Sequence, residues 1–178
     1  MSKYLFASII LILLSLSSFS QVFDLEEKKP AVDNGIEYGY VIKNEQSKTA
    51  SKEEFSRFEI TIYATNKSGC TKLYADRSDL PTAENVNVLA VFSCKNANGK
   101  RLTAKGGNVV ARDFYVTVKT NEKNAEGKTI TRSASTKAGF IFRNGNTVKA
   151  NIIVIVAKGE SPAMTCAVNY LPELQKLF

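Results

Sequence analysis

Histidine and tryptophan are both absent from this sequence of 178 residues. Without histidine the chain has no Ser-His-Asp triad, no Cys-His dyad, no imidazole metal ligand and no imidazole that titrates near neutral pH. This absence excludes most hydrolase mechanisms. No motif surrounds the acidic residues, so we predict that the protein is not an enzyme and uses no cofactor or metal ion. A hydrolase that relies on two carboxylates beside one cleft is the remaining enzymatic alternative.

Cysteine is scarce, with three residues at positions 70, 94 and 166. In an oxidising compartment this odd number predicts one disulfide and one free thiol, with three possible pairings. We favour a Cys70–Cys94 bridge, because both residues flank strands that we expect to be neighbours. Such a bridge would stabilise the fold by roughly 3 kcal/mol on the chain-entropy model. Cys166 is then expected to be a buried, small hydrophobic residue.

Long apolar runs are confined to the N-terminus, where Lys3 precedes the apolar segment Tyr4–Leu14. Small residues follow at Ser18 and Ser20. This pattern is typical of a secretory signal peptide, so residues 1–20 are predicted to be removed by a cut between Ser20 and Gln21. An uncleaved anchor is the alternative, but a spanning helix needs about 20 mostly apolar residues. We therefore expect an exported protein (periplasmic, outer-surface or secreted), without membrane insertion after cleavage.

Positive charge is in modest excess, with 24 bases against 17 acids. Removal of Lys3 with the signal peptide leaves 23 bases against 17 acids, a net charge of +6. The bases are scattered among acids, and the densest basic stretch runs only from Lys95 to Lys105. We therefore expect no nucleic-acid partner. Weak attraction to anionic glycans or lipid headgroups remains an open alternative.

The rest of the chain alternates apolar and polar residues with the period of two that is typical of β-strands. Examples are 36–42, 58–64 and 86–94, separated by turn signals such as Asn96-Ala97-Asn98-Gly99. Eight or nine short strands without helical periodicity predict an all-β fold, a single antiparallel β-sandwich that is immunoglobulin-like in the broad sense.

The domain is predicted to span residues 35–170, after a flexible leader at 21–34 and before a C-terminal tail at 171–178. The polar residues 44–54 and 121–127 are predicted to be loops. The most apolar strand, 148–157, is predicted to be central.

Three local patterns have a functional and a plain interpretation. Asp76–Asp79 could supply oxygen ligands to calcium, although the dense acidic spacing of a dedicated loop is missing. Asn66–Ser68 matches an N-glycosylation acceptor, but a plain turn is favoured. Arg112 and Asp113 are consecutive in a predicted strand and point to opposite faces, so we expect one to be solvated and the other tolerated at an edge.

Three stretches of the sequence resemble small, uncharacterised exported β-sandwich proteins of Gram-negative bacterial envelopes. They are Thr65–Cys70, Ser93–Thr103 and Phe142–Val148, together with the Ser-Phe-Ser-Gln end of the signal peptide. The resemblance covers roughly residues 35–160. It implies a periplasmic or surface location and brings no assigned activity or site.

The first functional hypothesis is a non-enzymatic, exported β-sandwich that binds or supports another envelope component, either a protein or a glycan. Strand edges and loop tips would form its binding surface. The second hypothesis is a carbohydrate- or calcium-dependent binding module, which predicts exposed tyrosines beside an oxygen-rich loop. The third is the carboxylate-based hydrolase, which requires two carboxyl groups within about 5–10 Å of each other in a cleft.

Overall fold

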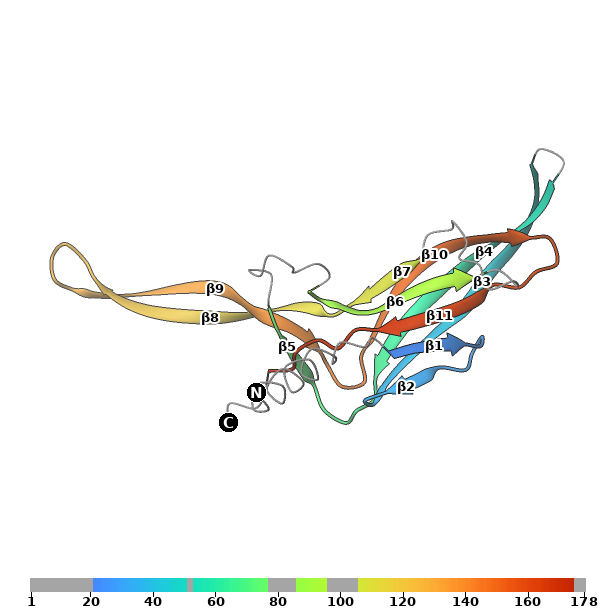
Figure 1. The fold of residues 1–178 in the computed structure, drawn as a ribbon. Coiled ribbons are helices and arrows are strands. Elements are labelled where there is room, and N and C mark those ends of the chain that lie inside the picture. The colour runs from blue at the N-terminus through green and yellow to red at the C-terminus, as the bar shows by residue number, and fades with distance from the viewer. Residues whose placement is uncertain (1–20, 51–52, 77–85, 96–105, 175–178) are drawn as a thin grey trace, which may run out of the picture.

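The computed structural model describes residues 21–50, 53–76, 86–95 and 106–174, and this part of the chain contains β-strands and no helix (Figure 1). Accordingly, the described residues include no helix that is long and apolar enough to cross a membrane. The signal peptide predicted for residues 1–20 lies outside them. The strands are β1 (Gln21–Leu25), β2 (Ala31–Asp33), β3 (Ile36–Ala50), β4 (Glu53–Asn66), β5 (Lys72–Ala75), β6 (Val88–Lys95), β7 (Gly107–Val110), β8 (Arg112–Lys123), β9 (Thr129–Phe142), β10 (Thr147–Ala157) and β11 (Ala163–Val168).

The strands form three antiparallel sheets, which confirms the predicted all-β class. The first sheet has the order β1-β11-β6-β7, the second β10-β4-β3-β2 and the third β5-β9-β8. The prediction of eight or nine short strands was wrong in both number and length. The described residues form eleven strands, and β3, β4, β8 and β9 are each 12 to 15 residues long.

Side chains from all three sheets share one buried core. Phe92 and Met164 contribute from the first sheet, Ile62 and Val154 from the second, and Phe140 from the third. Because these large side chains are excluded from water, their burial is the main stabilising contribution to the fold.

Gly107 marks the closest approach between the first and second sheets. A Cβ atom at this position would lie 2.5 Å from Cγ2 of Ile152 and 2.9 Å from Cδ1 of Ile62. Glycine therefore allows β7 to pack tightly over β10 and β4.

Several sequence-based assignments differ from the structure. The segment expected to be a leader forms β1 and β2, with Gln21 paired to Val168 at the edge of the first sheet. The strand 148–157 is β10, and it lies at the edge of the second sheet rather than at its centre. Its alternate residues Ile153 and Ile155 are exposed, so its apolar character does not reflect burial on both faces.

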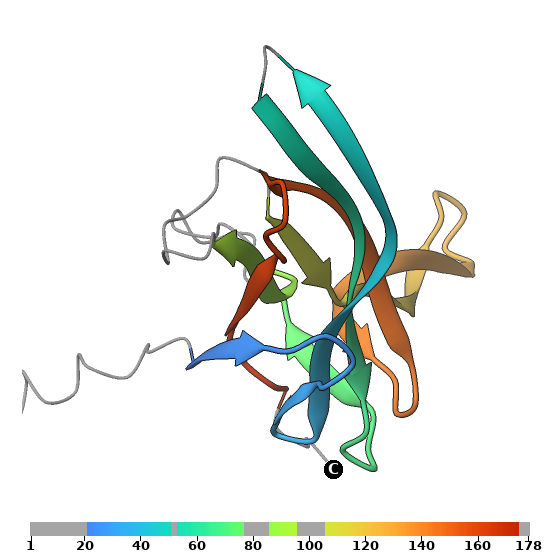
Figure 2. The same cartoon turned by 90° about the vertical axis from the view of Figure 1, so that its right-hand side faces the viewer.

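Two of the predicted loops are strand instead. Residues 44–50 continue β3 and residues 121–123 continue β8. Both segments belong to antiparallel hairpins, β3–β4 and β8–β9. Residues 121–123 are exposed, because the β8–β9 hairpin extends past the core and polar residues can there occupy either face. Figures 1 and 2 show these two hairpins projecting away from the strands that share the core. We call residues 115–137, the projecting part of the β8–β9 hairpin, the arm.

The three cysteines are free thiols, so the expected Cys70–Cys94 bridge is not formed in the structure. The two flanking strands are not neighbours, because β5 pairs with β9 whereas β6 pairs with β11 and β7. Cys70 is exposed in the turn after β4, and Cys94 is buried in β6. Cys166 is fully buried, as expected, and its burial raises the pKa of the thiol to about 12.

This arrangement predicts selective thiol chemistry. A thiol reagent at pH 8 should modify one cysteine in the folded protein, Cys70, and three after unfolding in urea without reductant. Burial keeps Cys94 and Cys166 protonated and out of reach, and the thiolate is the reactive form. The count is read from the intact mass after labelling. A count of only one thiol after unfolding would reveal a disulfide and contradict the prediction.

Candidate binding site at the base of the arm

The arm is a well-ordered hairpin rather than a loose loop. Its tip is a short turn in which the Asn124 side-chain oxygen accepts hydrogen bonds from the backbone N–H groups of Glu126 (3.1 Å) and Lys128 (2.9 Å). Gly127 has a φ of +78°, which this turn requires and which glycine adopts without strain. Along the strands, Thr131 donates to Asn121 at 2.8 Å. These contacts hold the ribbon in one register.

The two faces of the arm have different chemistry. One face carries Val116, Val118 and Ala134, and Val116 and Val118 are exposed. The opposite face carries Lys119 and Lys123 among hydroxyl side chains: Thr117, Thr129, Thr131, Ser133 and Ser135. Between Tyr115 and Lys123 the ribbon extends about 30 Å at the usual rise of a strand. A long surface with little support from the core is therefore held out into solvent.

A β-bulge marks the point where the arm leaves the body. The register shifts between Phe114, which faces Gly139, and Tyr115, which faces Lys137. Gly139 has a φ of +149°, and a Cβ atom there would lie 2.2 Å from the backbone oxygen of Tyr74. Glycine at this position lets β9 bend away while β5 stays in contact, and a bulge of this kind redirects the strand that carries it.

Lys137 fastens the base of the arm to the body. Its Nζ lies 3.1 Å from a carboxylate oxygen of Asp113 and 3.2 Å from one of Asp76. The same atom lies 4.2 Å from the centre of the buried Phe140 ring. The hydrogen bond to Asp113, followed by the contact with Asp76, raises the pKa of Lys137, so this residue stays charged at physiological pH.

The Asp76–Lys137–Asp113 group is the nearest approach to the hydrolase hypothesis. Two distances of 3.1 and 3.2 Å to one nitrogen place the two carboxylate oxygens no more than about 6.3 Å apart. That spacing lies within the range for paired catalytic acids. However, the ammonium group of Lys137 lies between them and pairs with both. This geometry favours a structural role, and we call Asp76, Lys137 and Asp113 the clip.

A polar hollow of about 140 Å³ lies beside the clip. Its wall includes Arg112 at the start of β8, Arg143 just after β9, and Asn146 and Thr147 at the start of β10. Ile141 lies between the two arginines, paired with Arg112 in the sheet register. Asp113 also lines the hollow, and it shares Lys137 with Asp76.

No protein family, curated protein or solved structure matches this chain. The site must therefore be interpreted from its own geometry. The resemblance to envelope proteins noted above remains an expectation from sequence.

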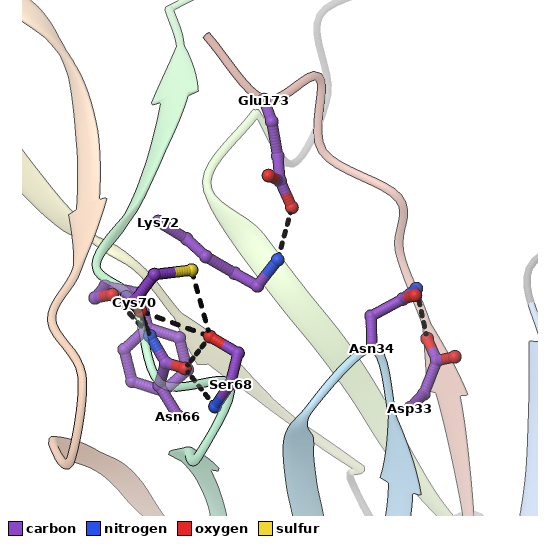
Figure 3. Close-up of polar contacts among 8 residues, drawn as sticks. Asp33, Asn34, Asn66, Ser68, Cys70, Lys72 and Glu173 are labelled. Atoms are coloured by element: carbon purple, nitrogen blue, oxygen red, sulfur yellow. Dashed lines mark hydrogen bonds and ion pairs between the residues drawn. The ribbon is translucent and has the colours of Figure 1, made fainter. Parts of the chain in front are cut away.

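The turn beside this hollow is held by a buried asparagine, Asn66, which is fully excluded from solvent. Its side-chain nitrogen donates to the backbone oxygens of Phe142 (2.7 Å) and Cys70 (2.9 Å), and its side-chain oxygen accepts from the Ser68 hydroxyl (2.7 Å) and N–H (3.0 Å). Figure 3 shows Asn66, Ser68 and Cys70 in this network. With both amide hydrogens engaged, Asn66 cannot accept a glycan in the folded protein, which supports the plain-turn interpretation.

The other sequence candidates lie apart or inside the core. Tyr38, Tyr40 and Tyr74 are buried, whereas Tyr115 and Tyr170 are exposed. Asp79, the partner of Asp76 in the proposed calcium loop, lies outside the described residues, and the described residues contain no cluster of three metal-ligating side chains. Arg112 and Asp113 are both exposed at the base of the arm, one in the hollow and the other paired with Lys137.

Sequence reasoning missed Arg143 and Lys137. Arg143 stands in an ordinary turn cluster and Lys137 in a polar strand, so neither has a local signal. Only the pairing of β8 with β9, including the bulge, brings them next to Arg112 and Asp113.

Proposed function

We propose that this chain is an exported, non-enzymatic binding protein that presents the arm to another component of the cell envelope. Its body would be a β-sandwich, immunoglobulin-like in the broad sense, with the first two sheets enclosing the core. Export rests on the signal-peptide pattern of residues 1–20 and envelope location on the sequence resemblance. The observation that carries the proposal is the arm itself.

An exposed two-stranded ribbon has a free-energy cost that calls for an explanation. Two strands alone are only marginally stable in water, and the ribbon displays Tyr115, Val116 and Val118 to solvent. A hairpin that is held out, ordered at its tip and fastened at its base is well suited to contact a partner, because little ordering is left to occur on binding.

The charge of the arm indicates the kind of partner. Residues 115–137 contain five bases and two acids, a net charge of +3. Half of the expected mature net charge of +6 thus lies in 23 residues. An excess of one sign on a projecting surface attracts molecules of the opposite charge, which favours an anionic partner.

Shortening the arm tests this proposal. Residues 117–135 are replaced by Asn-Gly, which leaves Val116 and Thr136 as the pair that closes a two-residue hairpin turn. We expect the full chain, cross-linked in the cells that produce it, to recover an envelope component that the shortened chain recovers at least tenfold less. The body should keep its thermal unfolding temperature, since no core side chain is removed.

Equal recovery by both chains, or no recovery by the full chain, would refute the binding role of the arm. The recovered protein should begin at Gln21, and a chain that still begins at Met1 would refute cleavage of the signal peptide.

A carbohydrate partner is the second candidate, and one observation favours it. The tyrosine at position 115 is 55% exposed and lies on the arm face that carries Thr117, Ser133 and Ser135. An exposed aromatic ring beside hydroxyl groups can stack on a sugar ring while the hydroxyls bond to it. Loss of the recovered component after Tyr115→Ala, with retention after Tyr170→Ala, would favour this candidate.

A further inference from the structure

We propose that the hollow at the base of the arm binds an oxyanion, a carboxylate or phosphate group, between the guanidinium groups of Arg112 and Arg143. The inference rests on the proposed function only for the source of the anion, which would belong to the envelope component that the arm contacts. The binding of the anion itself depends on the body and not on the arm.

The two arginines lie close to each other along the backbone of the β8–β9 pair. Arg112 begins β8 directly opposite Ile141 in the register, and Arg143 lies in the turn two residues after Ile141, just beyond the end of β9. Diagonal neighbours across such a pair have Cα atoms roughly 7–8 Å apart. Both residues line the hollow, so both positive charges contribute to the electrostatic potential around it.

No residue in the described part of the chain neutralises these two charges. Four arginines lie in the described residues, and two of them have carboxylate partners: Arg57 with Glu59 at 2.6 Å and Arg132 with Glu122 at 3.4 Å. The guanidinium groups of Arg112 and Arg143 make no ion pair or hydrogen bond with any described residue. They repel each other, and an anion bound between them would remove this repulsion.

Asp113, the acidic residue that lines the hollow, does not cancel the preference of the site for an anion. Asp113 lines the hollow, but its carboxylate is 3.1 Å from Nζ of Lys137. Lys137 is shared with Asp76, so these two acids and one base carry a net charge of −1, and with the two arginines a surplus of one positive charge remains. The arrangement therefore favours an anion over a cation or a neutral group.

The backbone of Arg143 is held in place before any ligand arrives. It opens a tight turn in which the Asn146 N–H donates to its backbone oxygen at 3.1 Å. Asn66 secures the same turn from behind, because its N–H donates to Asn146 (3.0 Å) and its backbone oxygen accepts from Gly145 (2.7 Å). A preformed site loses less entropy on binding, which raises affinity.

The size and chemistry of the hollow limit the ligand. A volume of about 140 Å³ corresponds to only a few water molecules, which suits one phosphate or carboxylate group and excludes a whole sugar chain. The planar fork of a guanidinium matches two oxygens of such a group. Asn146 and Thr147 add polar atoms to the wall.

The test is a titration followed by NMR, with inorganic phosphate and glucuronate as separate probes. Chloride keeps the ionic strength constant. We expect saturable shifts in the Asn146 and Thr147 amides and in the Arg112 and Arg143 side-chain N–H signals. Tighter binding of phosphate would identify a phosphorylated source, and tighter binding of glucuronate a carboxylated one.

Matched variants decide whether the two arginines are responsible. The double variant Arg112→Gln, Arg143→Gln should weaken binding of the preferred probe at least tenfold, whereas Arg132→Gln on the arm should leave it unchanged. Absence of saturation with both probes would overturn the proposal, as would equal affinity in the double variant. A uniform loss in all arginine variants would also overturn it, because it would indicate unspecific attraction.

The chain with the shortened arm separates this inference from the proposed function. It retains Arg112 and Arg143, so it should bind the anion with unchanged affinity even if it recovers no envelope component. If the arm proves dispensable for recovery while the anion still binds, the proposed role of the arm fails and the site remains. If the arm is required for recovery but no anion binds, the proposed anion site is refuted and the proposed role of the arm remains.

Discussion

Replacement of Asn66 by alanine should lower the free energy of unfolding by about 3–5 kcal/mol. The substitution removes both donors to the backbone oxygens of Phe142 and Cys70 and the acceptor for Ser68. The Phe142 contact is buried, and loss of such a partner costs about 1–3 kcal/mol; loss of the part-buried contacts with Cys70 and Ser68 adds to this cost. Domains are typically stable by only 5–15 kcal/mol, so this change removes a large share of the total.

Urea unfolding at pH 7 measures this effect, with Asn151→Ala as the matched control. Asn151 also accepts a side-chain hydrogen bond, from Thr61 at 2.8 Å, but it is exposed on β10. Water can replace that partner, so the control should lose less than about 1 kcal/mol. A loss of similar size in both variants would show that the buried network around Asn66 is not special.

Alkaline pH should destabilise the protein steeply, with onset near pH 9. Burial raises the pKa of Cys166 to about 12, and burial also raises the pKa values of Tyr38 and Tyr74 well above the usual value of 10.0. The folded chain therefore keeps three protons that the unfolded chain releases. The free energy of unfolding falls as pH rises through the unfolded pKa values, by up to about 1.4 kcal/mol per pH unit for each group.

The variant Tyr38→Phe isolates one of these contributions. Its free energy of unfolding should equal that of the parent protein near pH 7 and be about 1 kcal/mol higher at pH 11, because phenylalanine has no proton to release. Tyr115→Phe is the control, since its ring is largely exposed on the arm. Urea unfolding at the two pH values provides the measurement. An identical loss of stability with pH in the parent and in Tyr38→Phe would contradict this account.

The alternation of apolar and polar residues predicted the strands that cover the core. It did not predict the strand residues that extend past the core. Tyr38, Ile60 and Phe92 fall on buried faces as their spacing indicates. The ribbon residues Lys119 and Asn121 give no such signal, because a strand with water on both faces has no reason to alternate. The apolar residues Ile153 and Ile155 led to the opposite error. They suggested a central strand, but they lie exposed on an edge strand.

The candidate site was beyond the reach of sequence reasoning for a different reason. Arg112 was recognised as a charged residue between apolar neighbours, but its partner Arg143 is 31 positions away in an unremarkable turn. Their meeting depends on one register between β8 and β9 and on the bulge at Gly139. No local pattern encodes that register. Likewise, nothing in the sequence around Asn66 distinguishes a buried structural asparagine from an exposed acceptor.

The pairing of β1 with β11 sets an order of events for a chain that is synthesised from its N-terminus. The hairpins β3–β4 and β8–β9 join residues close in sequence, so they can form as soon as they emerge. β1 must wait, because the strand that it pairs with spans residues 163–168 and itself lies between β1 and β6. Closing such a long loop is slow and leaves apolar edges uncovered meanwhile. The strand that is synthesised first is thus among the last to be paired, and the new chain is vulnerable to aggregation until β11 is in place.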